Sequence, residues 1–275
     1  GAFLDSLDAG AVDGYVDGAL ATFNGNNENN TWALAETNLG QGALYIQDEW
    51  AMSSDFTLTY GLRVDMPLYF DTPTKIQENI DRAGFDYNPD IVYYNESGEA
   101  VTFDHTVLPS QTPLISPRVG FNYDAGGTGT MQVRGGTGLF SGRLPFVWIG
   151  NQVANPNWWF YCVTNPDFKY PQVWRSNLGI DRKLDNGWIL TTDIIYTKDI
   201  NGMMVRNYGL KAPTATLAGV DNRPIYGAGD VNDGPFGIFP NNAYVFTNTN
   251  VGSSFNWTLS AKKDFDNGMS ASLAY

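Results

Sequence analysis

Two sets of residues in this sequence have side chains suited to binding a ligand. The first is a run of aromatic residues that ends directly before the single cysteine, Cys162. The run consists of Trp158, Trp159, Phe160 and Tyr161. In an exposed loop these rings can stack on a sugar or clamp a peptide, or they can pack the loop onto its neighbours, and the sequence leaves both interpretations open. For Cys162 we expect a packed thiol.

The second set is a group of charged residues on the polar side of alternating segments. Its members are Arg63, Asp65, Arg118, Arg134, Asp181, Asp193 and Lys262. Such side chains can contact a solute or form structural ion pairs with one another. The sequence alone does not decide between these two roles.

Other motifs give no support for catalysis or cofactor binding. Carboxylates are plentiful, but nothing in the sequence places two of them together as an acid–base pair. The glycine-rich segments 126–129 and 135–138 lack the spacing of a phosphate-binding loop and do not lead into a helix. We therefore expect no catalytic residue, no cofactor and no enzymatic activity.

A metal site is not expected either. The only histidine, His105, lies in a predicted loop, where we expect it to be exposed. Asp230, Asn232 and Gly234 match part of a calcium loop, but its distal glutamate is missing. We expect a solvated turn at this position.

The composition excludes several classes of protein. The chain of 275 residues is 43% hydrophobic and only 16% charged, with a net charge of −13. Low charge argues against a disordered chain, and a negative balance argues against a nucleic-acid partner. No apolar run is long enough for a transmembrane helix. Because Gly1 does not begin a signal peptide, we expect a mature chain or a piece of a longer one.

The segment 56–64 shows which element must position these side chains. Phe56, Leu58, Tyr60, Leu62 and Val64 alternate with polar residues and glycine. Because side chains alternate across a strand, this segment has one apolar and one polar face. The apolar face meets a core in a soluble sheet, and it meets lipid in an outer-membrane barrel.

Similar alternation predicts an all-β chain with about eight strands and no helix. The predicted strands are 43–52, 56–64, 116–124, 130–140, 172–184, 188–198, 244–263 and 269–275. The short turns 53–55, 125–129, 185–187 and 264–268 alternate with the long loops 66–113, 142–171 and 199–243. Long unstructured loops are uncommon in compact soluble domains, whereas outer-membrane barrels combine short periplasmic turns with long extracellular loops. The sequence therefore predicts an antiparallel up-and-down transmembrane β-barrel.

Several strands also resemble those of a known family. The strings Tyr-Ile-Gln-Asp-Glu-Trp at 45–50, Leu-Thr-Tyr-Gly-Leu-Arg-Val-Asp at 58–65, Ser-Pro-Arg-Val-Gly-Phe at 116–121 and Val-Arg-Gly-Gly-Thr-Gly at 133–138 carry the resemblance. They resemble strands of TonB-dependent outer-membrane transporters, above all the Oar-like receptors with a carboxypeptidase-regulatory-like domain. The resemblance covers about residues 43 to 275.

The resemblance implies a barrel of about 22 strands around a plug domain. It implies transport across the outer membrane of a Gram-negative bacterium, driven by the TonB–ExbB–ExbD system through the plug. The expected partners are outer-membrane lipid and lipopolysaccharide, and a surface lipoprotein or other envelope protein is a further candidate. The polar-face charges would then face the lumen or the plug. Neither a plug nor a TonB box is recognised here, so residues 1–275 are expected to form part of one barrel domain.

Two alternatives remain at this point. Eight strands can close into a small barrel that serves as a pore, adhesin or anchor. The alternating strands could also form a soluble secreted β-protein that binds glycans. A closed small barrel would require the first and last strands to pair, and we expect that they do not.

Overall fold

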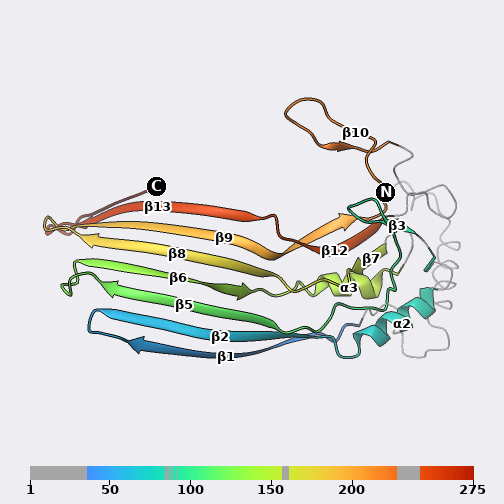
Figure 1. Cartoon of the computed structure of the whole chain (residues 1–275), viewed down its shortest axis with the longest axis horizontal. Coiled ribbons are helices and arrows are strands. Elements are labelled where there is room, and N and C mark those ends of the chain that lie inside the picture. Colours follow the sequence, from blue (N-terminus) through green and yellow to red (C-terminus); the bar gives the residue numbers. More distant parts are fainter. Residues whose placement is uncertain (1–35, 84–86, 88, 91, 157–160, 228–241) are drawn as a thin grey trace, which may run out of the picture.

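The computed structural model describes residues 36–83, 87, 89–90, 92–156, 161–227 and 242–275. Its main feature is one antiparallel sheet of long strands that follow one another up and down (Figure 1). In sheet order these strands are β1 (Gly40–Ala51), β2 (Phe56–Leu68), β5 (Leu114–Asp124), β6 (Met131–Ser141), β8 (Gln172–Lys183), β9 (Trp188–Asn207), β13 (Ser253–Asp264) and β14 (Ser270–Ala274). We call this set of strands the barrel wall. It confirms the predicted all-β, up-and-down architecture.

The two outer strands of the wall do not pair with each other. Among the described residues β1 pairs with β2, and β14 pairs with β13. The wall is therefore an open sheet, as expected for part of a larger barrel and not for a closed eight-stranded one. Consecutive wall strands are also neighbours in the sheet, so each strand positions its polar side chains beside those of the next strand.

The four short turns all lie at one end of the wall, and the long connections lie at the other (Figure 1). In the turn between β8 and β9, the Leu184 nitrogen donates to the Trp188 oxygen at 2.8 Å, and Gly187 has a φ of 83°. A residue without Cβ adopts this left-handed conformation without a steric cost. The Asn-Gly sequence therefore predicted this turn correctly.

The long connections gather at the end opposite the short turns, in a region that we call the loop cap. It holds α2 (Thr72–Ala83), β3 (Tyr93–Tyr94), β4 (Ala100–Val101), α3 (Val147–Ala154), β7 (Tyr161–Thr164), β10 (Ala215–Thr216), β11 (Pro224–Ile225) and β12 (Ala243–Thr249). The loop cap continues the sheet of the wall through the pairing of β12 with β9. The prediction that the chain contains no helix was wrong. Ile76 and Ile80 are spaced by one helical turn and are both buried. The surrounding Pro residues obscured this short helical signal, although Pro73 is well suited to the first turn of α2.

The predicted strands differ most from the structure at the end of β9 and within the segment 244–263. β9 was expected to end at Lys198 but runs to Asn207, so the third long loop begins later. The predicted strand 244–263 is divided at residues 250–252, so that β12 pairs with the second half of β9 and β13 with the first half. At the break, a Cβ on Gly252 would collide with the Asp199 carboxylate. Only glycine lets the chain pass this close to that side chain.

The buried apolar residues gather in three clusters at the loop end. The largest joins Ile149 of α3 to Phe246 of β12 and to Leu114 at the start of β5. The Phe246 ring stacks on those of Trp148 and Phe168, with centroids 4.9 and 4.6 Å away. Within the described ranges, neither α2 nor α3 has the length and apolar character of a membrane-spanning helix.

Candidate functional site

The strand register places all the predicted charges of the wall on one face. Residues directly opposite each other on paired strands share a face of the sheet. Arg118 lies opposite Gly61 on β2, and Arg134 lies opposite Asn122 on β5. Following the register in this way assigns one common face to Arg63, Asp65, Arg118, Arg134, Asp181, Asp193 and Lys262. We call it the polar face.

Arg134 is the centre of the most highly connected ion-pair cluster on this face. Its Nε lies 3.0 Å from Asp181 on β8, and its Nη2 lies 2.9 Å from Asp193 on β9. Thr191 donates a further hydrogen bond of 2.6 Å to Asp181. Gly179 stands directly between Arg134 and Asp193, and a Cβ there would lie 2.7 Å from the Arg134 guanidinium carbon. The missing side chain at Gly179 lets the guanidinium reach across β8.

The other polar-face charges are arranged as smaller groups. Arg63 holds Asp65 with two hydrogen bonds of 2.9 and 2.8 Å, and Gln41 donates a third to the same carboxylate. Asp65 is buried where the loop cap meets the wall. Lys262 lies 3.3 Å from Asp264 near the turn end. Most of the predicted charges are thus engaged in ion pairs, which favours the structural role for them.

Most of the exposed large apolar side chains of the wall lie on the opposite face, although Tyr45, Ile189 and Ile195 lie on the polar face. Leu62, Leu178, Trp257 and Leu259 are all exposed on the opposite face. Asp48 is the polar exception that interrupts the alternation of β1, and the Tyr60 hydroxyl donates a 2.8 Å hydrogen bond to its carboxylate. An apolar outer band and a polar inner face are the arrangement of a membrane barrel wall.

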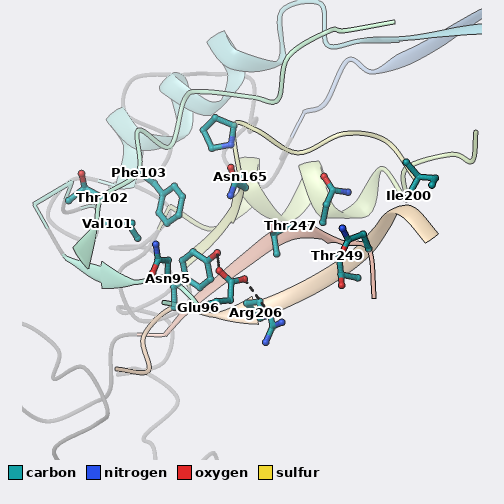
Figure 2. A pocket seen from close by; sticks show the side chains of 14 residues that line it. Asn95, Glu96, Val101, Thr102, Phe103, Asn165, Ile200, Arg206, Thr247 and Thr249 are labelled. Atoms are coloured by element: carbon teal, nitrogen blue, oxygen red, sulfur yellow. Dashed lines mark hydrogen bonds and ion pairs between the residues drawn. The ribbon is translucent and has the colours of Figure 1, made fainter. Parts of the chain in front are cut away.

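A pocket of about 700 Å³ lies at the loop end of the wall (Figure 2). Three separate parts of the chain line it: the β3–β4 hairpin, the turn at 165–166, and β9 with β12. Its lining residues include Asn95, Glu96, Thr102, Phe103, Asn165, Ile200, Arg206, Tyr208, Thr247 and Thr249. No local motif predicted this pocket, because it joins distant segments such as those of Glu96 and Tyr208, which are 112 positions apart.

A polar cluster fixes one side of the pocket. Glu96 accepts a 2.7 Å hydrogen bond from the Tyr208 hydroxyl and lies 3.4 Å from Arg206 Nε. Burial, together with the Glu96 hydrogen bond, raises the pKa of Tyr208, so its hydroxyl stays protonated and acts as a donor. The Phe103 ring lies 6.0 Å from that of Tyr208. The pocket thus offers an aromatic ring, an ion pair, hydroxyls and amides to a ligand.

Only one member of the predicted aromatic run lies within the described residues. Trp158, Trp159 and Phe160 fall outside them, as do Asp230, Asn232 and Gly234. Tyr161 is buried in β7, where its ring stacks on Tyr93 at 5.4 Å between centroids. This residue therefore packs the loop cap, and contact between the rest of the run and a solute stays a prediction.

The prediction of an exposed His105 was wrong. His105 is fully buried; its Nε2 donates to the Gln152 carbonyl, and the Gln152 amide donates to the His105 carbonyl at 2.8 Å. Burial lowers the pKa of His105 to about 4, so the ring is neutral at pH 7. His105 thereby joins the first long connection to α3 of the second. Sequence reasoning missed this because the partner lies 47 residues away.

The expectation for Cys162 is confirmed. Its thiol is buried in β7, and this burial raises its pKa to about 11. A thiol with this pKa is almost entirely protonated at neutral pH and is a poor nucleophile. Cys162 therefore serves packing in the loop cap.

Together, the fold and the polar face have the features of a transmembrane β-barrel wall with short turns at one end and long loops at the other. The family model for the outer membrane beta barrel domain matches residues 6–275. The chain belongs to this family of outer-membrane β-barrels, and its location is the outer membrane of a Gram-negative bacterium.

Solved outer-membrane proteins are similar to this chain at low identity. The outer membrane transporter YddB from Escherichia coli is 12% identical, with 82% of this chain and 21% of that chain covered and a TM-score of 0.46. A mutant of the ferric enterobactin receptor PfeA from Pseudomonas aeruginosa is 14% identical, with 86% and 26% covered and a TM-score of 0.48. The FrpB iron transporter from Neisseria meningitidis is 13% identical, with 83% and 25% covered and a TM-score of 0.42. The chain spans 21–26% of the length of these three proteins, and no curated protein matches it.

Proposed function

We propose that this chain forms one part of the wall and surface loops of an outer-membrane transporter that imports a solute with energy from the TonB–ExbB–ExbD system. The resemblance of the strands at 45–65 and 116–138 to TonB-dependent transporters supports this proposal. The main structural support is a polar inner face that ends in a loop cap with a polar pocket. In this proposal the pocket contacts the solute first, and the chain carries out no catalytic step.

The chemistry of the pocket suits a polar solute. Glu96 and Arg206 place opposite charges side by side, and Thr102 and Thr247 add hydroxyl groups. Such groups orient a ligand through hydrogen bonds, while the Phe103 ring supplies apolar contact area. Uptake would follow from release of the solute toward the polar face of the wall.

The proposal can be tested before the solute is identified. Cells with the intact protein should deplete at least one compound from a defined mixture of nutrients, and a deletion strain should leave that compound behind. Cells that lack TonB should also leave it behind. Depletion that needs the protein but not TonB would contradict energised import and favour the alternative of a passive pore.

A matched pair of variants tests the pocket. Arg206→Gln removes the cation beside Glu96 and should reduce uptake of the identified compound. Arg223→Gln is the control, because Arg223 pairs with Asp221 at 2.7 Å on the exposed segment between β10 and β11. Equal uptake by the two variants would contradict the proposed contact between the pocket and the solute.

A further inference from the structure

Two arginines of the polar face flank a glycine in one row across three strands. Arg118 of β5 lies opposite Gly138 of β6, and Gly138 lies opposite Arg175 of β8. All three residues therefore share the polar face, with the Cα atoms of the two arginines about 10 Å apart. Arg175 was not among the charges predicted from the sequence.

The floor between these arginines is made of glycine. Gly138 separates them, and in the next row of the same face Gly120 lies opposite Gly136. A Cβ on Gly138 would lie 2.9 Å from Arg118 Cγ, so glycine is needed for the Arg118 side chain to lie across β6. A cavity of about 260 Å³ is lined by both arginines together with Gln47, Thr59 and Asn177. Both arginines therefore border a shallow depression on the polar face, which Gly61, Gly120 and Gly136 also line.

Both guanidinium groups are held in place by uncharged neighbours. The Arg118 guanidinium carbon lies 4.4 Å from the centre of the Phe140 ring, and its Nε lies 3.4 Å from the Leu139 carbonyl. Arg175 Nε donates to Thr197 Oγ1 at 3.1 Å. Within the part of the chain that the structure describes, neither arginine forms a salt bridge with a carboxylate.

Arg134 on the same face provides the contrast. It contacts two carboxylates, Asp181 and Asp193, and its charge is compensated. Arg118 and Arg175 are two cations without such compensation among the described residues, in a chain whose net charge is −13. Guanidinium groups bind carboxylate and phosphate oxygens through paired hydrogen bonds, and they do so most strongly when they are already oriented.

We propose that Arg118 and Arg175 form an oxyanion-binding site on the polar face, lined by Gly120 and Gly136, that takes a carboxylate or phosphate group. The group comes either from a free solute in the lumen or from another part of the protein. This inference does not require energised import, and its test measures binding in purified protein without TonB.

Citrate is a suitable probe, since it carries several carboxylates that can accept paired hydrogen bonds from guanidinium groups. We would measure citrate affinity of the intact protein in detergent by calorimetry at constant ionic strength, with chloride as the compensating ion. Arg118→Gln and Arg175→Gln should each weaken citrate binding by roughly tenfold or more, the factor expected for one lost charge-assisted hydrogen bond. Arg182→Gln is the matched control, because Arg182 lies on β8 but on the opposite face.

A second measurement distinguishes the two sources of the oxyanion. If a carboxylate of the protein occupies the site, the wild type should not respond to citrate, and the double variant of Arg118 and Arg175 should unfold at a lower temperature than Arg182→Gln. If the site takes a free solute, the unfolding temperatures should agree and only citrate binding should be lost. A double variant that matches Arg182→Gln in both citrate affinity and unfolding temperature would overturn the proposal.

Discussion

The barrel wall exposes large apolar side chains on its outer face, whereas the loop cap buries its own. On the wall, residues such as Leu62, Leu178 and Trp257 remain exposed on the outer face. In the cap, Ile76, Ile149 and Val245 are fully buried against other parts of the same chain. The wall thus relies on lipid to remove its apolar surface from water, whereas the cap builds its own dry core.

Because of this difference, the stability of the wall and that of the cap should depend on different interactions. The cap should respond to mutation as a small soluble domain does, through packing density and buried polar groups. The wall should respond according to which face a side chain occupies. The following predictions test that separation, from the largest expected effect to the smallest.

Ile149→Ala should lower the free energy of unfolding of the cap by about 2–5 kcal/mol, because it leaves a cavity at a fully buried position. The loss should be seen as faster hydrogen exchange in α3 and β7 of the intact protein. The control is Ile194→Ala on the outer face of β9, which opens no such cavity. Faster exchange throughout the wall strands in the Ile149 variant would show that the cap and wall unfold as one unit.

Ile194→Arg should destabilise the protein in lipid by roughly 2–4 kcal/mol, because it places a charge on the lipid-facing side of the wall. Ile195→Arg should cost much less, since the side chain of residue 195 points to the polar face. The two isoleucines make a matched pair: they are adjacent in β9 and are 36% and 37% exposed. Equal unfolding free energies for the two variants would contradict the assignment of the faces.

Lowering the pH from 7.5 to 5 should destabilise the cap by about 2 kcal/mol through His105. Its pKa is about 4 in the folded protein and near 6.5 when unfolded, so the unfolded state binds more protons between these values. The stability contributed by neutral His105 is complete above pH 6.5 and decreases as the pH falls toward 4. Hydrogen exchange of α3 at both pH values measures this effect, and His105→Asn should reduce the pH dependence.

Gly179→Ala should have the smallest effect, up to about 1 kcal/mol, because its Cβ would displace Arg134 from a partly exposed ion-pair cluster. Gly42→Ala in β1 is the control, since an added Cβ there meets no atom within 4 Å. Unfolding free energies in detergent compare the two variants. A larger loss of unfolding free energy for Gly42→Ala than for Gly179→Ala would mean that backbone propensity, and not the Arg134 cluster, dominates at these positions.

The sequence by itself determined the wall and left the cap to the tertiary structure. Alternation at Phe56–Val64 and the Asn-Gly turn at 186–187 are local signals, since a strand shows its two faces every second residue and a tight turn needs specific φ values. These signals located the strands, assigned Arg134 and Asp181 to one face, and placed the four turns at one end.

The cap depends on contacts between distant segments, which no local pattern contains. His105 is buried because it forms hydrogen bonds with Gln152. The pocket exists because Glu96 forms an ion pair with Arg206 and accepts a hydrogen bond from Tyr208. The register across β5, β6 and β8 likewise decided that Arg118 and Arg175 flank Gly138. Alternation tells which face a side chain occupies, but only strand pairing determines which side chains stand beside it.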